Sequence, residues 1–165
     1  MLYIQLIGLL AFCVLVLSYY KKNTVTILVY QITANFAYAV HYFLLGGLSG
    51  AFNSVISIIR NIIFINSKDN KRLLSIIFIM LYLLVTIVFY ENFYSVFPMI
   101  ANSLYLLSLV SNNRKSIIIG GILDALFWLL YSIFVFSYVG VITELILIIS
   151  NTIQLLKLNK SNAHK

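Results

Sequence analysis

Seven apolar stretches, each long enough to cross a lipid bilayer, constrain this chain more than any other feature of its sequence. The hydrocarbon core is ~30 Å thick and a helix rises ~1.5 Å per residue, so about 17–25 mostly apolar residues make one span. A span must satisfy its own backbone hydrogen bonds, and continuous apolar runs favour helices over the alternating strands of a barrel. The sequence therefore predicts an all-α membrane protein with seven transmembrane helices, at residues 2–18, 24–45, 48–65, 73–90, 93–110, 116–134 and 138–156.

The composition excludes an ordinary soluble domain. The 165 residues are 62% apolar and 9% charged, whereas a soluble domain has roughly 45–50% apolar and ~25% charged residues. A globule of this size has no means of hiding so much apolar surface. A single cysteine, Cys13, excludes an intramolecular disulfide. The net charge of +7 would point to nucleic acid only if the basic residues formed one face of a soluble module.

The basic residues instead occupy every second break between the apolar runs. Ten of the eleven Lys and Arg residues lie in the segments 21–23, 68–72 and 113–115 and in the tail after residue 156. The intervening breaks, which contain no basic residue, are at 46–47, 91–92 and 136–137. Because cytoplasmic loops are enriched in Lys and Arg, this alternation predicts an N-terminus outside the cell and a C-terminus in the cytoplasm.

An internal repeat is visible when the chain is shifted by 90 residues, which lays the fifth to seventh runs on the first to third. Small and polar residues coincide in this shift: Ala11 with Ala101, Ser18 with Ser108, Asn23 with Asn113, Gly50 with Gly140 and Asn61 with Asn151. An offset of four spans is even, so both copies have the same orientation. We expect one membrane domain with a three-helix repeat at 1–66, a linker helix at 67–92, a second three-helix repeat at 93–157 and a cytoplasmic tail at 158–165.

This three-plus-one-plus-three plan resembles the SWEET and PQ-loop transporter superfamily. The chain departs from the SWEET pattern because it has no Pro-Gln dipeptide and because Pro98, the expected hinge, is its only proline. A closer resemblance is to the YgjV family of bacterial inner-membrane proteins, and it covers most of the first 66 residues. Residues 6–12 and 41–51 carry it, with Asn53, Arg60 and Asn61 after them. This resemblance implies the fold and a location in the bacterial inner membrane, and it does not imply a particular activity.

Four ionisable side chains fall inside the predicted spans, where each costs at least about 2.5–3.5 kcal/mol at a helix centre. Counting along the helices at ~1.5 Å per residue places His41 and Glu144 at one level near the outer ends, and Arg60 and Asp124 nearer the inner ends. We expect these residues to act as gating or ion-pair groups. Alternatively, His41 caps its helix hairpin and Arg60 extends its long stem to the headgroups.

The repeat-matched amides Asn61 and Asn151 are the predicted substrate-binding pair. Each offers an acceptor and two donors, which suits a hydroxylated or amide-bearing solute. The resemblance to SWEET proteins, in which paired asparagines hold sugar, implies the same role. The alternative is a hydrogen bond between helices, worth about 0.6–2 kcal/mol. Further predicted lining residues are Asn35, Asn102 and Trp128, with Gln31 and Asn53 beside them, although plain packing is the alternative for Trp128.

The sequence contains no metal, nucleophile or nucleotide signature, so we expect no enzyme activity, no cofactor and no metal site. Two functions remain open: a small-solute transporter, and a non-transporting receptor-like or scaffold protein. The predicted partners are the lipid bilayer and a small polar solute, sugar-like or a small anion, with no nucleic acid and with homo-oligomer formation left open. A polar cavity reaching the membrane midplane favours transport, whereas tight packing there favours a scaffold.

Overall fold

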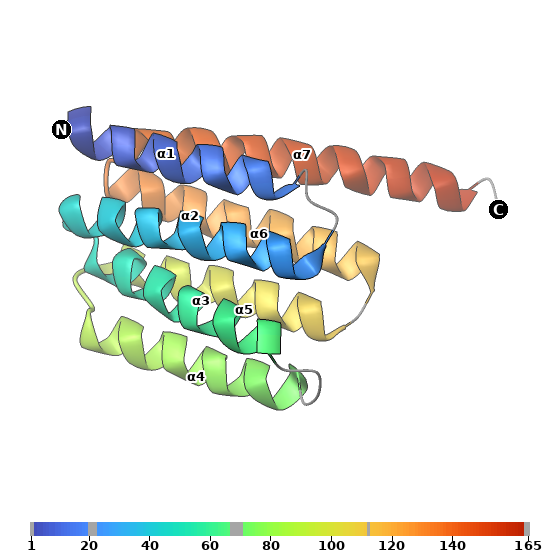
Figure 1. The fold of residues 1–165 in the computed structure, drawn as a ribbon, viewed down its shortest axis with the longest axis horizontal. Coiled ribbons are helices and arrows are strands. Elements are labelled where there is room, and N and C mark those ends of the chain that lie inside the picture. The colour runs from blue at the N-terminus through green and yellow to red at the C-terminus, as the bar shows by residue number, and fades with distance from the viewer. Residues whose placement is uncertain (1, 20–22, 67–70, 112, 164–165) are drawn as a thin grey trace.

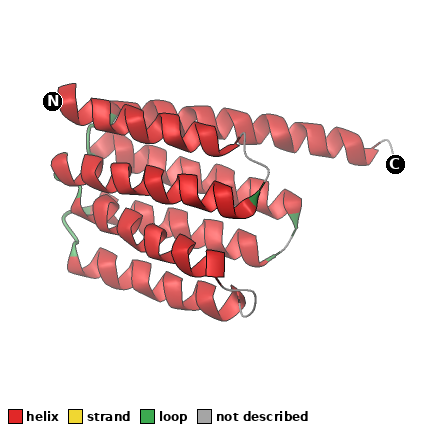
Figure 2. Cartoon of the chain, viewed as in Figure 1, coloured by secondary structure: helices red, strands yellow, loops and turns green. Residues whose placement is uncertain are grey.

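The computed structural model describes residues 2–19, 23–66, 71–111 and 113–163, and every regular element within these ranges is helical (Figure 2). The elements are α1 (Leu2–Tyr19), α2 (Thr24–Leu44), α3 (Leu48–Asn66), α4 (Lys71–Val88), the 3-10 helix η1 (Phe93–Val96), α5 (Phe97–Val110), α6 (Arg114–Phe134) and α7 (Tyr138–Ala163). The predicted all-α fold with seven helices is confirmed.

The helices run up and down in two layers (Figure 1). One layer holds α1, α2 and α3, and the other holds α7, α6 and α5 behind them. Within the layers α2 packs between α1 and α3, and α6 packs between α5 and α7. Helix α4 lies along the edge of the bundle, where it packs on both α3 and α5 and so joins the two layers.

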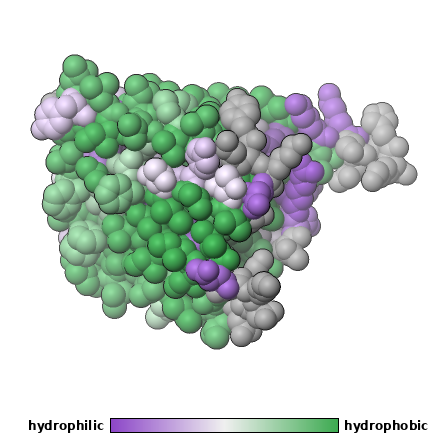
Figure 3. All heavy atoms as spheres, in the orientation of Figure 1, coloured by the Kyte–Doolittle hydropathy of each residue, from purple (hydrophilic) through white to green (hydrophobic). Residues whose placement is uncertain are grey.

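The two ends of the bundle differ in character. The end on the left of Figure 1 holds the turns 45–47, 89–92 and 135–137, and we call it the turn end. The opposite end, where α6 begins at Arg114 and α7 extends past Lys157, is called the basic end. Hydrophilic residues gather towards the basic end in Figure 3, and apolar side chains cover most of the visible side wall.

The outer surface of the bundle is suited to lipid. Leu10 is 59% exposed and Ile87 is 66% exposed, as are many other large apolar side chains. Among the described residues, four segments are long and apolar enough to cross a membrane: Leu48–Asn66, Phe93–Val110, Arg114–Phe134 and Tyr138–Lys160. Helices α1 and α4 are apolar but shorter, with apolar segments at Leu2–Ser18 and Arg72–Val88. Membrane crossing by α1, α2 and α4 stays a prediction.

Local sequence signals explain where several helices begin. Asn23 caps α2, because its side-chain oxygen accepts a hydrogen bond from Val25 N at 2.9 Å. Asn113 caps α6 in the same way, accepting from Lys115 N at 3.0 Å. Pro98 stands at the first positions of α5, directly after η1, where a missing N–H costs no helical hydrogen bond.

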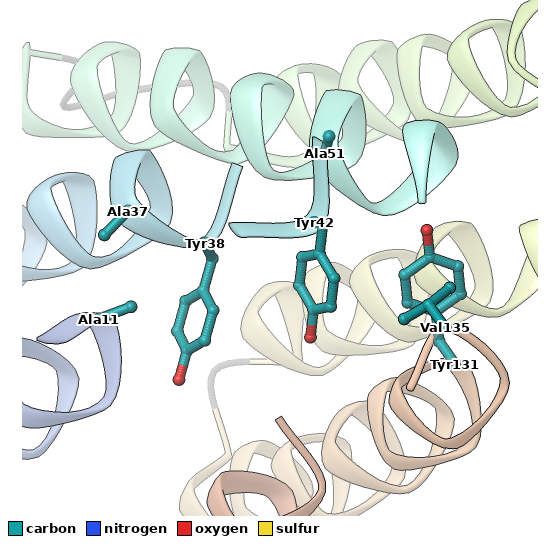
Figure 4. Close-up of a cluster of buried hydrophobic side chains, with 7 residues drawn as sticks. All are labelled: Ala11, Ala37, Tyr38, Tyr42, Ala51, Tyr131 and Val135. Carbon is teal, nitrogen blue, oxygen red and sulfur yellow. The ribbon is translucent and has the colours of Figure 1, made fainter. Parts of the chain in front are cut away.

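Buried aromatic residues fill the middle of the bundle. In Figure 4, Tyr38 and Tyr42 point from α2 towards the second layer, and the hydroxyl of Tyr131 points back towards α3. A separate cluster of Phe78 and Tyr82 on α4 with Leu106 on α5 fixes α4 against the bundle. The small buried residues Ala11, Ala37 and Ala51 allow the first three helices to pack closely around the tyrosines.

Candidate functional site

A cavity of about 310 Å³ lies between the two layers, and its lining side chains come from every long helix except α4. Its polar and charged lining is formed by Gln31, Asn35, Ser54, Ser57, Arg60, Asn102, Asp124, Glu144, Asn151 and Gln154. The aromatic lining is formed by Tyr38, Tyr42, Tyr105 and Trp128. The remaining lining residues are Leu15, Ile117, Ile118, Gly121 and Leu147. A cavity with many polar and aromatic side chains thus lies inside a bundle whose outer surface is apolar.

Arg60 is held on one side of this cavity by three helices. Its Nε donates to Asn61 Oδ1 at 3.1 Å, and its Nη1 donates to the Tyr82 hydroxyl at 3.2 Å. The guanidinium also lies 5.9 Å from the centre of the Tyr105 ring. Arg60 is 6% exposed, so its charge is fixed inside the protein and does not extend to headgroups.

The two carboxylates of the cavity are much less constrained. Within the described residues, neither Asp124 nor Glu144 makes a hydrogen bond or an ion pair, although both line the cavity. Asp124 lies within electrostatic reach of Arg60, and Glu144 lies within reach of Asp124. The structure therefore brings the predicted residues Arg60, Asp124 and Glu144 into one site without a direct salt bridge.

The predicted amide pair is used asymmetrically. Asn61 is 2% exposed and does not line the cavity, because it accepts from Arg60 and donates to Gln31 Oε1 at 3.5 Å. Asn151 lines the cavity, and its Nδ2 lies 3.1 Å from the position that a Cβ on Gly121 would occupy. Gly121 is 90 residues after Gln31, so the second layer has a glycine where the first has the partner of its asparagine. No hydrogen bond of the Asn151 amide is seen within the described residues, and the amide lies beside Gly121.

Asn102 lines the cavity but is also bonded within the protein. Its Nδ2 donates to the Pro98 carbonyl at 2.8 Å, and its Oδ1 accepts from Ser57 Oγ at 3.1 Å. Ser57 Oγ in turn lies 2.9 Å from the Tyr82 hydroxyl that Arg60 contacts. Asn35 and Trp128 also line the cavity, as predicted, whereas Asn53 donates to Ser49 and Thr86 away from it.

His41 does not meet Glu144, the residue expected at its level. Its Nδ1 lies 2.8 Å from the Ile4 carbonyl, and its Nε2 lies 2.7 Å from Ser137 Oγ. The ring is fully buried, and Gly8 leaves room for it, since a Cβ there would lie 2.9 Å from Cε1. His41 thus joins α1, α2 and the start of α7 outside the cavity, in keeping with the anchoring alternative.

Contacts between the layers close the cavity at the turn end. Tyr42 and Ser132 meet through their hydroxyls at 3.0 Å, and Gly50 N donates to the Tyr131 hydroxyl at 2.8 Å. The contact of His41 with Ser137 lies beside them. At the other end the lining reaches Ile117, in the first turn of α6, and the exposed Gln154. The cavity therefore extends towards the basic end and is closed towards the turn end.

The tyrosines of the lining are the part of the site that the sequence does not predict. Tyr38, Tyr42 and Tyr105 belong to a set of twelve tyrosines whose hydropathy does not separate cavity from lipid. A shift of 90 residues would have found two of the three, because it pairs Tyr38 with Trp128 and Leu15 with Tyr105. Several residues that line the cavity in one layer thus have a counterpart 90 residues away that lines it in the other layer.

No curated protein and no solved structure matches this chain. A family model described as "Bacterial inner membrane protein", Imp-YgjV, matches residues 2–162. The match covers nearly the whole chain, and so extends the resemblance well beyond the first 66 residues. The apolar helices that surround the cavity agree with an integral membrane protein. The chain belongs to the Imp-YgjV family of bacterial inner-membrane proteins.

Proposed function

We propose that this membrane protein transports a small solute by alternating access, with the cavity between its two layers as the solute site. The observation that carries the proposal is a polar cavity of about 310 Å³ inside an apolar bundle. Small-molecule pockets measure about 300–1,000 Å³. A scaffold would gain stability by bonding these polar side chains to one another, yet Asp124 and Glu144 make no such bonds in the described chain.

Corresponding turns support a repeat of three helices on either side of α4. Helix α2 (Thr24–Leu44) and helix α6 (Arg114–Phe134) have bounds exactly 90 residues apart, and α3 and α7 begin 90 residues apart. The Gly47 N–Tyr42 O bond of 2.9 Å in one turn corresponds to the Ser137 N–Ser132 O bond of 2.9 Å in the other. This agreement favours the SWEET-like and PQ-loop-like three-plus-one-plus-three architecture.

The lining of the cavity follows the same correspondence. Five pairs of lining residues are related by the 90-residue shift: Leu15 and Tyr105, Gln31 and Gly121, Tyr38 and Trp128, Ser54 and Glu144, and Ser57 and Leu147. Tyr42 and Ser132, which touch each other, are also so related. Two residues related by a two-fold axis can touch each other only close to that axis. The axis that relates the two repeats would therefore pass near Tyr42 and Ser132, at the closed end of the cavity. Transporters commonly bind solute at such an interface.

The structure fits a state that is open towards one side of the membrane. With the basic end in the cytoplasm, the cavity would be reached from the cytoplasm and closed towards the outside. Opening to the outside would separate Tyr42 from Ser132, Tyr131 from Gly50 and His41 from Ser137. We place the accompanying bend at the junction of η1 and α5 beside Pro98, because η1 and α5 differ in helical geometry.

The test is a ligand screen followed by transport. The purified protein is heated in detergent with sugars, nucleosides, amino acids, amines and organic acids, and any solute that binds only the folded state raises the melting temperature. A solute found in this way is then offered to vesicles that contain the protein. We expect saturable uptake that protein-free vesicles lack. A solute that binds but never accumulates would contradict transport.

A further inference from the structure

Glu144 is a buried carboxyl group that has no partner among the residues the structure describes. It is 7% exposed, it lines the cavity, and it makes no hydrogen bond or ion pair within the described residues. Burying an uncompensated carboxylate is costly. A carboxyl in such a place is neutralised from outside the chain, either by a proton or by a bound cation.

The charges of the cavity identify Glu144 as the unbalanced one. Among the acidic and basic residues, the lining contains one guanidinium, on Arg60, and two carboxylates, on Asp124 and Glu144. Arg60 acts electrostatically on Asp124, so these two charges offset each other. Ionised Glu144 would then leave a single negative charge, which a ligand with one positive charge would balance.

The aromatic rings around Glu144 indicate the kind of cation. Tyr42 lies between two other rings, with its centre 5.4 Å from that of Trp128 and 6.1 Å from that of Tyr38. All three line the same cavity, and Glu144 is within electrostatic reach of Tyr42. Aromatic faces attract ammonium groups, including quaternary ones that cannot donate hydrogen bonds. A strongly hydrated inorganic ion would gain less from such walls.

We infer that the cavity selects a small organic cation, whose ammonium group lies against the Glu144 carboxylate and the rings of Tyr38 and Trp128. The inference rests on the proposed function in taking this cavity as the solute site. Asn151 and Asn35, which also line the cavity, are available to the polar remainder of the ligand. This organic cation replaces the sugar-like or anionic solute expected from the amides and from Arg60, because the charge of Arg60 already acts on Asp124.

The test compares cations with neutral molecules of the same shape. Choline is paired with 3,3-dimethylbutan-1-ol, and ethanolamine with propan-1-ol, in calorimetric binding to the purified full-length protein at neutral pH. We expect at least one cation to bind about tenfold or more tightly than its neutral counterpart, as cation–π contacts and a charge-assisted bond require. Equal binding within both pairs would overturn the inference without any variant being needed.

A matched pair of variants assigns the effect to Glu144. Glu144→Gln keeps the shape and removes the charge, and Glu91→Gln makes the same change at an exposed residue outside the cavity. We expect Glu144→Gln to remove the preference for the cation and Glu91→Gln to retain it. Unchanged preference in Glu144→Gln would overturn the inference.

Vesicle uptake separates failure of this inference from failure of the transport proposal. If choline or ethanolamine binds through Glu144 but does not accumulate, the cation site stands and transport is contradicted. If a sugar or an organic acid accumulates while neither cation binds better than its neutral counterpart, transport stands and the cation site is overturned. Under that second outcome Glu144 would carry a proton in place of an organic cation.

Discussion

At the scale of single residues, Tyr131 shows how one hydroxyl joins the two layers. It accepts a hydrogen bond from Gly50 N, one of the first amides of α3, which lack partners in their own helix. Tyr131→Phe removes the acceptor and keeps the ring, so we expect a loss of about 1–2 kcal/mol in the free energy of unfolding. Tyr3→Phe, at a residue 64% exposed, is the matched control. Equal stability of the two variants in denaturant titrations would contradict the assigned contact.

Gly121 keeps the amide of Asn151 free, and its replacement tests the use of that space. Gly121→Gln would give the second layer the side chain that Gln31 supplies in the first, where it bonds to Asn61. We expect the new amide to occupy Asn151 and part of the cavity, and to weaken solute binding about tenfold or more by excluding the ligand. Gln31→Gly, the reverse change, serves as its control and should not obstruct the cavity. Calorimetric titration measures both, and unaltered affinity in Gly121→Gln would count against the site.

The sequence predicts how deep a side chain lies in the membrane better than it predicts which neighbouring helix that side chain faces. Counting residues placed His41 and Glu144 at one level, but neighbouring helices decide that His41 turns to Ile4 and Ser137 while Glu144 turns to the cavity. Likewise Asn61 and Asn151 lie 90 residues apart, but Asn61 is bonded to Arg60 and Gln31, whereas Asn151 lies beside Gly121. Such choices depend on packing between helices, which hydropathy does not contain.

At the scale of elements, the two equivalent turns reach the same backbone shape with different residues. Gly46 has φ +84° and Phe136, 90 residues later, has φ +56°. A side chain in this left-handed region costs roughly 1–2 kcal/mol. Gly46→Ala should therefore lower the free energy of unfolding by about 1 kcal/mol. Phe136→Gly should leave the free energy of unfolding unchanged or raise it by up to ~1 kcal/mol. Glycine relieves the backbone strain in the folded state, and this gain offsets or exceeds the greater freedom that glycine gives the unfolded chain. Equal losses in thermal unfolding would contradict this reading.

Helix positions were predictable because each span is a continuous apolar run bounded by polar or glycine residues. The prediction of 24–45 against Thr24–Leu44, and of 48–65 against Leu48–Asn66, shows how closely such runs define a helix. Two details were not predictable in this way. Helix α7 continues to Ala163 beyond the apolar run, because polar residues are as compatible with helix as apolar ones outside the membrane. The 3-10 turn η1 before Pro98 has no hydropathy signal.

At the scale of the whole molecule, the distribution of charge predicts its orientation. Asn23 begins α2 at the basic end, and Glu91 lies in the turn after α4 at the turn end. We expect reporters fused after these residues to lie on opposite sides of the inner membrane, with Asn23 in the cytoplasm, because basic loops are retained there. Activity-based reporters that work on one side only provide the readout. Both fusions on one side would contradict the seven-span arrangement.

If the cavity is a solute site open to one side, water enters it from the basic end alone. The direct measurement is labelling of Asn151→Cys by a membrane-impermeant thiol reagent, applied to either side of the membrane in a Cys13→Ala background. Leu10→Cys, on the lipid-facing surface, and Asn61→Cys, buried beside the cavity, are the controls. We expect rapid labelling of Asn151→Cys from the cytoplasmic side and little labelling of either control. Protection of Asn151→Cys from both sides, or reaction from the outside alone, would contradict it.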